Sequence, residues 1–485
     1  MTKPLQLTIY LVVISMWPPF LAAQYPDTVW TRTFGESLRD MGYAICLAPD
    51  ESYLIAGNTG SLDGESSTVY LLKIRDDGDL IWDNHWVTDG YSYARYMART
   101  RDECYILTGQ AGYPGFYGNP LLLKIDQDGN EIWHQVYEEG MHGNSAIEDA
   151  NGNFLIVGGH LGNLADAILI YADADGNEIW HRIYDIDLNE YAEDIKPHPD
   201  GGYIIAGCTG TGDGDGWDIF LMKIDDQGEQ EWIKYYGYPG VHCDDYPATI
   251  ELTSDGGYII GATTYSSSNT YADFWLMKTD DQCDTLWTRI IGGQYDDVGH
   301  AAKETYDGCY VMTGYSYTFG PAGKNVYVVK TGPMGGLRWI AAIGGYYTDS
   351  GWDFLENKYH ELIIVGETDS FGAGSRDAYV IKLPADQVGI GDSLNALPIS
   401  FNLTQNYPNP FNASTMIKYE LPYQSQVTIE IYDILGRKIT TLQNGPQPAG
   451  YHQALWRAED VTSGVYFYKL QAGDHAETKK VILVK

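Results

Sequence analysis

Tyrosine and aspartate carry most of the binding chemistry that can be recognised in this sequence. They recur in long polar segments between apolar stretches. A tyrosine ring can stack on the apolar face of a sugar or anchor a protein partner. A carboxylate can accept hydrogen bonds from hydroxyl groups or ligate calcium. The predicted ligand-binding residues are Tyr238, Asp244, Tyr265, Tyr295, Asp297, Tyr315, Tyr346 and Asp349.

Catalytic signatures are scarce by comparison. Asp244-Asp245 and Asp296-Asp297 are adjacent pairs, whereas a glycosidase needs two carboxylates that face each other across ~5–10 Å. No GxSxG, HExxH or P-loop motif occurs. We therefore predict no catalytic residue and no cofactor. Calcium is the one cation that acidic segments such as 212–218 could hold, and the metal assignment stays open.

An internal repeat must position these residues. Tryptophan recurs at spacings of 52, 51, 47, 52, 55 and 52, at Trp30, Trp82, Trp133, Trp180, Trp232, Trp287 and Trp339. A second series keeps constant phase with it, at Lys73, Lys124, Tyr171, Lys223, Lys278, Lys330 and Lys382. Two independent series in phase indicate about seven repeats of roughly 50 residues.

Each repeat contains four short stretches with strand character. In the fifth repeat these are WIKYYG, PATIEL, YIIGATTY and DFWLMKTD, separated by polar turns. Four strands in about 50 residues is the size of a propeller blade. The repeats begin on a tryptophan strand and end on a lysine strand, so the first strand can complete the last blade and close a ring. An open solenoid is the alternative.

Loops of a propeller alternate between its two ends, and here the two sets differ. The DxxG and DGG turns are short and repetitive, which indicates a structural role. The loops that precede the first and third strands of each blade are longer and more variable, and function usually lies in such loops. All eight predicted ligand-binding residues lie in these loops or beside them, most densely in repeats five to seven.

Charge and cysteine content narrow the partners. The chain has a net charge of −36, with 30 basic and 66 acidic residues among 485. Such a chain repels nucleic acid and anionic membranes, so we predict no nucleic-acid partner. From Phe401 onward there are 8 basic and 7 acidic residues, and this change in charge indicates a domain boundary near residue 400. The six cysteines form no CxxC pair, and the sequence leaves their disulfide status open.

The first residues have the features of an export signal. Lys3 precedes an apolar stretch that ends at Leu21-Ala22-Ala23, which predicts a signal peptide over 1–23 and a mature start near Gln24. An uncleaved anchor is the alternative. No other stretch reaches the ~20 apolar residues of a membrane span. We therefore predict a secreted or cell-surface protein without a transmembrane segment once the signal is removed.

The last 85 residues carry four ordered motifs: FNLTQNYPNPFN, IYDILGRKI, SGVYFYKL and a terminal KKVILVK. Their order and spacing resemble the type IX (Por) secretion system C-terminal sorting domain, whose fold is an Ig-like β-sandwich. The resemblance implies that the secretion machinery is a partner of this module. The sorting motif residues that it implies are Asn406, Tyr407, Pro408, Asn409, Pro410, Phe411, Gly436, Arg437, Gly464, Tyr466, Lys479 and Lys480. A plain Ig-like accessory domain is the alternative.

Together these features predict an all-β chain. We expect a signal peptide at 1–23, a seven-bladed propeller at 24–382, a linker at 383–400 and a sorting domain at 401–485. The expected function is non-catalytic binding of an extracellular glycan or protein on one propeller face. A secreted polysaccharide-degrading enzyme is the alternative.

Overall fold

The structure is a computed structural model that describes two parts of the chain. The first comprises residues 28–35, 39–60, 67–86, 90–112, 118–138, 140–161, 165–186, 189–210, 216–237, 243–265 and 271–385. The second comprises 401–403, 406, 409, 411–412, 414–421, 425–447, 450–458, 461–473 and 475–484. The predicted signal peptide lies outside the described residues. No helix in these ranges is long and apolar enough to cross a membrane.

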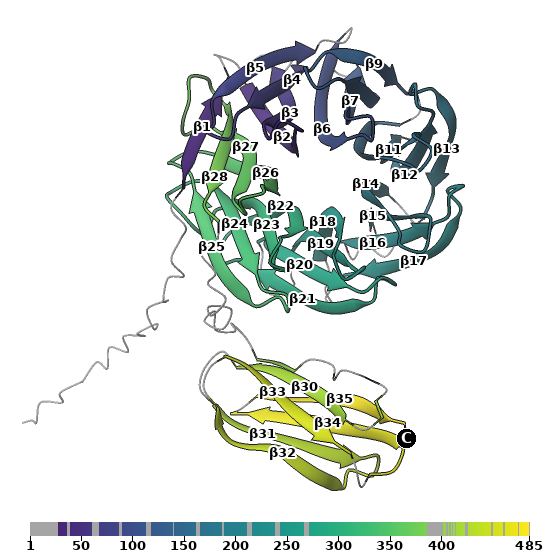
Figure 1. The fold of residues 1–485 in the computed structure, drawn as a ribbon, viewed down its shortest axis with the longest axis vertical. Coiled ribbons are helices and arrows are strands. Elements are labelled where there is room, and N and C mark those ends of the chain that lie inside the picture. The colour runs from purple at the N-terminus through teal and green to yellow at the C-terminus, as the bar shows by residue number, and fades with distance from the viewer. Residues whose placement is uncertain are drawn as a thin grey trace, which may run out of the picture.

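The first part is a ring of seven antiparallel four-stranded blades (Figure 1). The first strands, nearest the axis, are β2 (Arg39–Leu47), β6 (Tyr91–Arg99), β10 (His142–Glu148), β14 (Glu190–Pro197), β18 (Cys243–Leu252), β22 (Asp297–Glu304) and β26 (Asp349–Glu356). The second strands are β3 (Tyr53–Gly60), β7 (Tyr105–Gly112), β11 (Phe154–Leu161), β15 (Tyr203–Gly210), β19 (Tyr258–Thr264), β23 (Tyr310–Ser316) and β27 (Leu362–Thr368).

The third and outer strands complete each blade. The third strands are β4 (Ser67–Ile74), β8 (Asn119–Ile125), β12 (Ala165–Ala172), β16 (Gly216–Ile224), β20 (Asp273–Thr279), β24 (Asn325–Thr331) and β28 (Asp377–Leu383). The outer strands, which carry the repeated tryptophan, are β5 (Leu80–Trp86), β9 (Glu131–Val136), β13 (Glu178–Tyr184), β17 (Gln230–Tyr236), β21 (Thr285–Ile291), β25 (Leu337–Ile343) and β1 (Trp30–Phe34). We number the blades one to seven in the order of their first strands.

Strand β1 closes the ring, as the sequence predicted. It pairs antiparallel with β28, and Trp30 lies opposite Lys382. The outer strand of blade seven therefore comes from the other end of the repeat region, and blade seven has four strands like the other blades. This pairing excludes the open solenoid.

The short turns join neighbouring blades. In the turn between β4 and β5, Gly78 has a φ of +84°, and a Cβ there would lie 3.3 Å from the Trp30 ring of blade seven. The Trp30 indole donates a hydrogen bond to the Asp76 carbonyl of the same turn, at 3.1 Å. Gly335 and Trp287 repeat this arrangement between blades six and five. The turn glycine thus serves both the tight hairpin and the close approach of a tryptophan.

The repeated lysine lies at the same end of the propeller. Lys278 is almost fully buried and reaches the Asp255 carboxylate at 3.0 Å, and Lys73 and Asp50 are also 3.0 Å apart. In blade three Tyr171 takes the place of the lysine and donates to Asp149 at 2.8 Å. The hairpin end, which we define as the end formed by these short turns, therefore carries one contact that recurs in six blades, and in blade four Lys223 pairs with Glu231 of the outer strand instead.

Every first strand contains a one-residue β-bulge at its midpoint. In six blades a glycine of the second strand faces the bulge, at Gly57, Gly109, Gly158, Gly207, Gly314 and Gly366. A Cβ on Gly57 would lie 1.7 Å from the Met41 carbonyl oxygen. Only glycine permits that approach, and the bulge in turn re-aims one side chain per blade.

The C-terminal module is a two-sheet sandwich. One sheet has the order β29 (Asn402–Leu403), β30 (Ser414–Leu421), β33 (Gly450–Arg457). The other has the order β32 (Lys438–Gln447), β31 (Ser425–Asp433), β34 (Gly464–Ala472), β35 (His475–Leu483). Inward-facing residues of both sheets, including Ile417, Ile429, Trp456 and Tyr468, form one core. This is the β-sandwich that the C-terminal motifs predicted.

Candidate binding site in the propeller channel

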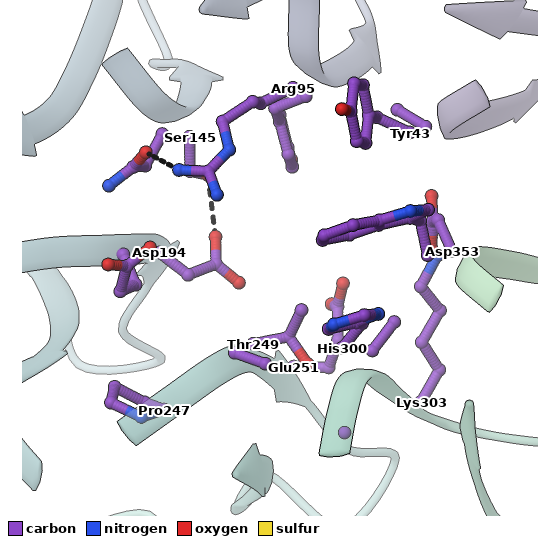
Figure 2. A pocket seen from close by; sticks show the side chains of 18 of the residues that line it. Tyr43, Arg95, Ser145, Asp194, Pro247, Thr249, Glu251, His300, Lys303 and Asp353 are labelled. Carbon is purple, nitrogen blue, oxygen red and sulfur yellow. Dashed lines mark hydrogen bonds and ion pairs between the residues drawn. The ribbon is translucent and has the colours of Figure 1, made fainter. Parts of the chain in front are cut away.

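The bulges place one side chain from each blade around a central cavity of about 640 Å³ (Figure 2). We call these seven positions the bulge ring: Tyr43, Arg95, Asn144, Glu193, Ala248, His300 and Trp352, in blade order. The backbone repeats at these positions, but no two side chains are the same. The cavity volume lies within the range of small-molecule sites, ~300–1,000 Å³.

Blade order divides the bulge ring into two arcs. Blades six, seven and one contribute the aromatic arc of His300, Trp352 and Tyr43. Blades two, three and four contribute the polar arc of Arg95, Asn144 and Glu193. Ala248 of blade five leaves a gap between the arcs. The cavity therefore has an apolar half and a hydrogen-bonding half, which is the usual make-up of a site that both holds and orients a small ligand.

The rings of the aromatic arc pack on one another. His300 and Trp352 are stacked, with centroids 3.9 Å apart and an interplanar angle of 2°. Tyr43 meets Trp352 edge to face at 5.0 Å. Nδ1 of His300 lies 2.7 Å from the Gly351 carbonyl oxygen. Burial, with the nearby Lys324 and Arg95 charges, lowers the pKa of His300 to about 3, so the ring is neutral at ordinary pH.

Arg95 is the central group of the polar arc. Its Nη1 donates to the Asn144 side-chain oxygen at 3.0 Å, and the Asn144 amide donates to the Ala192 carbonyl at 3.0 Å. Burial raises the pKa of Glu193, and the Arg95 guanidinium opposes that shift. The arc thus offers a fixed cluster of donors and acceptors from three adjacent blades.

Nearer the hairpin end, the cavity is lined by charged groups that already bind one another. Lys196 lies 3.3 Å from both Asp194 and Glu251, and Lys303 lies 2.7 Å from Asp353. Asp194 also accepts hydrogen bonds from the Ser145 hydroxyl at 2.6 Å and the Ile250 amide at 3.0 Å. These contacts join neighbouring blades. The bulge ring is therefore the part of the lining that is better placed to meet a ligand.

Two of the predicted tyrosines line this cavity. Tyr315 is the last residue but one of β23 and Tyr265 directly follows β19, and both reach the cavity from the variable-loop end. Tyr315 contacts the His300 ring at 5.6 Å, and the Lys324 ammonium lies 3.7 Å from the centre of the Tyr315 ring.

Two further predicted tyrosines are not in the cavity. Tyr295 is 52% exposed and Tyr346 is 79% exposed, on the loops that lead into β22 and β26. Tyr238 lies outside the described residues. The structure thus places the predicted tyrosines in two locations at the variable-loop end, one inside the channel and one around it.

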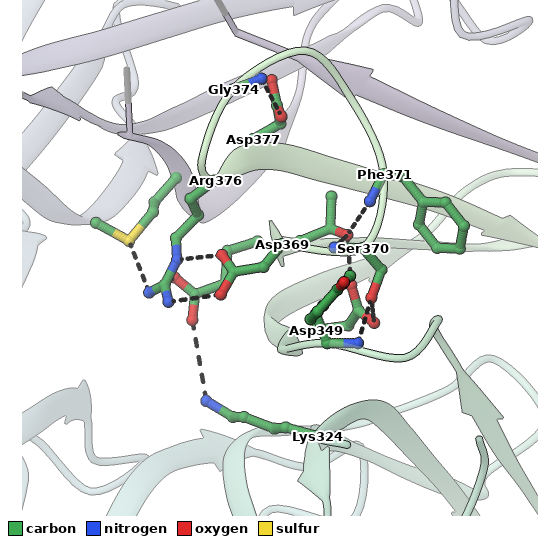
Figure 3. Close-up of polar contacts among 12 residues, drawn as sticks. Lys324, Asp349, Asp369, Ser370, Phe371, Gly374, Arg376 and Asp377 are labelled. Carbon is green, nitrogen blue, oxygen red and sulfur yellow. Dashed lines mark hydrogen bonds and ion pairs between the residues drawn. The ribbon is translucent and has the colours of Figure 1, made fainter. Parts of the chain in front are cut away.

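Two of the three predicted carboxylates, Asp297 and Asp349, are buried among loop backbone groups rather than lining the cavity. Asp349 accepts hydrogen bonds from the Gly345 amide at 2.8 Å and the Ser370 hydroxyl at 2.7 Å (Figure 3). Its own amide donates to the Lys324 carbonyl of blade six at 2.7 Å. Asp297 makes the same backbone contact with Ala272, and burial together with the neighbouring Asp273 carboxylate raises the pKa of Asp297.

Asp244 is one residue out of register with these carboxylates. Asp297 lies opposite Ser316 and Asp349 opposite Thr368, but the residue opposite Thr264 in blade five is Asp245. Because side chains alternate between the faces of a strand, a shift of one residue reverses the environment. The equivalent residue of blade five is therefore the buried Asp245.

A polar network links blades six, seven and one (Figure 3). Arg376 forms a two-point ion pair with Asp369, at 2.8 and 3.1 Å, and contacts the buried Glu367 at 3.0 Å. Lys324 lies 3.9 Å from Glu367. Burial raises the pKa of Glu367, and the two cations oppose that shift. The network fixes the loops beside Tyr43 and Tyr315.

One group of carboxylates has the spacing of a cation site. Oxygen atoms of Asp166, Asp185 and Glu190 lie within 4.8 Å of one another among the residues that the structure describes. Asp166 lies in β12 of blade three, Asp185 follows β13, and Glu190 begins β14 of blade four, away from the predicted carboxylates. Three oxygen ligands are fewer than calcium takes in its usual sites.

The polar arc and Trp352 were missed in the sequence, although a signal for their positions is present. The second strand of most repeats reads as an aromatic or aliphatic start followed by a glycine, as in YILTG, FLIVG, YIIAG, YVMTG and LIIVG. That interior glycine marks a bulge in the neighbouring strand. This pattern is enough to locate the bulge-ring positions in the sequence, and the sequence then gives the residue at each of them.

The predicted sorting motif residues that are described fall into buried and exposed groups. Asn406 is buried and donates through its amide nitrogen to the Thr415 hydroxyl at 2.9 Å. Asn409 accepts from the Ile482 amide at 2.9 Å, and Phe411 lies beside Leu483 of the last strand. These contacts fasten the first motif to the C-terminal strand. Tyr407, Pro408 and Pro410 lie outside the described residues.

The other motif residues lie in strands and a turn. Tyr466 packs on Trp456 and donates to the Thr462 carbonyl at 2.7 Å, and Gly464 begins the same strand. Gly436, with a φ of +76°, allows the β31–β32 turn, in which Arg437 pairs with Asp433 at 2.7 Å. The last strand carries Lys479, which lies 3.5 Å from Glu477, and Lys480, which lies opposite Phe467.

Comparison with known proteins identifies the tail. Residues 405–485 match the family model described as the secretion system C-terminal sorting domain. This confirms the resemblance seen in the sequence and indicates export to the outside of the cell. No curated protein matches the chain.

Solved structures with a similar fold share little sequence with the chain. A protein of unknown function from Bacteroides caccae is 11% identical, with a TM-score of 0.40 over 60% of this chain and 94% of that one. PorZ, a surface component of the type-IX secretion system of Porphyromonas gingivalis, is 11% identical, with a TM-score of 0.33 over 90% and 69%. The propeller domain of the Trilobed protease from Pyrococcus furiosus is 12% identical, with a TM-score of 0.39 over 73% and 94%.

Proposed function

We propose that the propeller is a non-catalytic binding module, carried outside the cell by its sorting domain, and that it binds its extracellular ligand at the variable-loop end of the channel. The ligand is a glycan or a protein segment. The bulge ring is the observation that carries this proposal. Seven equivalent backbone positions present seven different side chains to one cavity. Architecture alone does not require that diversity, whereas recognition of an asymmetric ligand does.

The acidic residues of the cavity favour binding over glycoside hydrolysis. Such hydrolysis uses two facing carboxyl groups, one of them protonated. Asp194, Glu251 and Asp353 are each held by a lysine. Glu193 has a raised pKa, but those lysine contacts leave it without a second carboxylate ready to act as base or nucleophile.

The test measures binding and hydrolysis in the same samples. The full chain is screened against a glycan array and a panel of extracellular proteins, and reducing-sugar release is followed in parallel. We expect binding without release. Arg95→Ala should abolish binding, whereas Tyr306→Ala should not, because Tyr306 is 82% exposed in a turn at the hairpin end.

Two results would contradict the proposal. One is binding that survives Arg95→Ala but disappears in Tyr306→Ala, which would place the ligand at the other end of the ring. The other is sustained sugar release that Glu193→Gln eliminates, which would establish the polysaccharide-degrading enzyme instead.

A further inference from the structure

Outside the cavity, the loops of blades five to seven carry a second set of rings. Their exposed aromatic residues, which we call the outer arc, are Tyr271, Tyr295, Tyr317, Tyr346, Tyr347 and Phe371. All six lie in variable loops at the end of the propeller where Tyr265 and Tyr315 enter the cavity.

Contacts between neighbouring loops hold the outer arc in place. Tyr271 and Tyr295 meet edge to face at 5.6 Å. The Tyr295 amide donates to the Thr318 hydroxyl at 3.0 Å, beside Tyr317, and the Tyr347 amide donates to the Ser370 hydroxyl at 3.0 Å, beside Phe371. Loops fixed in this way lose little entropy on binding, so they present their rings as a ready surface for a partner.

The outer arc is continuous with the cavity through one pair of rings. Tyr315, which lines the cavity, meets the exposed Tyr317 edge to face at 5.8 Å. A ligand that occupies the cavity and continues outward along blades five to seven would therefore keep aromatic contacts along its length.

Charge limits what that ligand can be. The charged side chains that line the cavity are Arg95, Lys196, Lys303, Glu193, Asp194, Glu251 and Asp353, which leaves one surplus negative charge. The chain as a whole carries −36. The charge of the whole chain would repel an anionic polymer, and a surplus of one negative charge in the cavity is too small to select a highly charged ligand of either sign.

The hydrogen-bonding pattern limits it further. Arg95 uses Nη1 to hold Asn144, and the Asn144 amide gives one of its two N–H groups to Ala192, so both side chains have further N–H groups to offer beside the Glu193 carboxyl within one arc. A ligand whose groups both donate and accept hydrogen bonds suits this mixture of donors and acceptors, and the adjacent hydroxyls of a sugar ring are such groups. The opposite arc and the tyrosines offer apolar contacts for the carbon side of the same ring.

Building on the binding function proposed above, we propose that the site binds a neutral glycan chain. A terminal or branch sugar occupies the cavity between the polar and aromatic arcs, and the following sugars lie along the outer arc of blades five to seven.

The experiment compares short and long neutral ligands. The full chain is run through native gels that contain dextran, mannan, xylan, arabinan or laminarin, with polygalacturonate and alginate as acidic counterparts. Affinities for the glycan that retards it, and for the matching di- and trisaccharides, are then measured by calorimetry. We expect retardation by at least one neutral glycan and by neither acidic one.

The variants separate the two parts of the site. Arg95→Ala should weaken the short and long ligands alike, by ~10-fold or more, since it removes a charged donor from the cavity. The double variant Tyr346→Ala, Tyr347→Ala should weaken the polymer by about 3- to 10-fold and leave the disaccharide unchanged, because these rings lie outside the cavity. Tyr306→Ala serves as the control for both.

Several outcomes would overturn the inference. These are retardation by an acidic glycan, no retardation by any neutral glycan, or an equal effect of the outer-arc variant on disaccharide and polymer. If the chain instead binds a protein, and Arg95→Ala removes that binding, the glycan inference is overturned but the proposed binding function stands. If Arg95→Ala still binds every ligand that the parent binds, both the glycan inference and the proposed binding function are refuted.

Discussion

The hairpin end and the bulge ring, which lies midway along the first strands, use the same sevenfold repeat in opposite ways. At the hairpin end, one contact recurs from blade to blade, as in Lys278 with Asp255 and Lys73 with Asp50. At the bulge ring, the backbone recurs but the side chains all differ. Repeated chemistry at the first set of positions builds the ring. At the second set, unique side chains on a repeated backbone create an asymmetric site without cost to the architecture.

This comparison predicts that a change to the repeated backbone is the most damaging. In Gly57→Ala, the new Cβ would meet the Met41 carbonyl oxygen at 1.7 Å, and a backbone atom of a first strand cannot rotate away. We expect a loss of ~3 kcal/mol in stability, at the upper end of overpacking effects, together with loss of ligand binding. Differential scanning calorimetry of the full chain measures the propeller transition.

Gly210→Ala is the matched control, because it also changes a glycine of a second strand. The nearest atoms to its Cβ are those of Trp217 at 3.8 Å, which is ordinary contact. Equal destabilisation by both variants would show that the bulge geometry is not what makes the glycine necessary.

The hairpin-end contacts should make stability depend on pH. Although burial acts to raise the pKa of Asp102 and Asp307, hydrogen bonds and charge from Lys124 and Lys330, together with Thr100 and Thr305, hold each pKa down to about 2. Carboxylates with depressed pKa values stabilise the fold above their unfolded pKa of ~4, and this contribution is lost as the pH falls through the folded value. Thermal midpoints should therefore decrease between pH 4 and pH 2.

The double variant Asp102→Asn, Asp307→Asn tests the origin of that decrease. It should melt a few degrees below the parent at pH 6, and the difference should shrink as the pH approaches 2. Asp281→Asn, at an exposed turn position, should follow the parent throughout. An undiminished difference at pH 2 would show that these ion pairs are not responsible.

The sequence predicted the repeated features well and the unique ones poorly. The tryptophan and lysine series predicted about seven blades and a ring closed by the first strand on the last blade, because similar residues in constant phase report a common structure. The bulge ring has no such series, since its members have nothing in common except position. Blade five offers two adjacent carboxylates, Asp244 and Asp245, and only the strand pairing shows that Asp245, rather than the predicted Asp244, is the equivalent of Asp297 and Asp349.

The predicted tyrosines illustrate both outcomes. Placement of the variable loops at one end of the ring followed from strand order, so Tyr265, Tyr295, Tyr315 and Tyr346 all lie at that end. Which of them face the cavity depends on the inward reach of each loop, and local sequence does not encode that. The exposed pair, Tyr295 and Tyr346, and the cavity pair, Tyr265 and Tyr315, could be separated only once the blades were in place.

Removal of the exposed pair of rings should have the smallest effect on stability, and this variant sharpens the comparison between the variable-loop end and the hairpin end. Tyr295→Ala with Tyr346→Ala removes rings that are 52% and 79% exposed, so stability should change by no more than ~0.5 kcal/mol per site. Binding should nevertheless weaken several-fold, because both rings belong to the outer arc.

The matched change at the hairpin end is Gln227→Ser in the DDQG turn, where the backbone carbonyl, rather than the side chain, holds Arg182 at 2.8 Å. It should alter neither stability nor binding. Calorimetric melting and ligand titration of the two variants test this prediction. If both proteins stay folded, Gln227→Ser abolishes binding and the tyrosine pair proves dispensable, the functional and structural ends of the ring have been assigned in reverse.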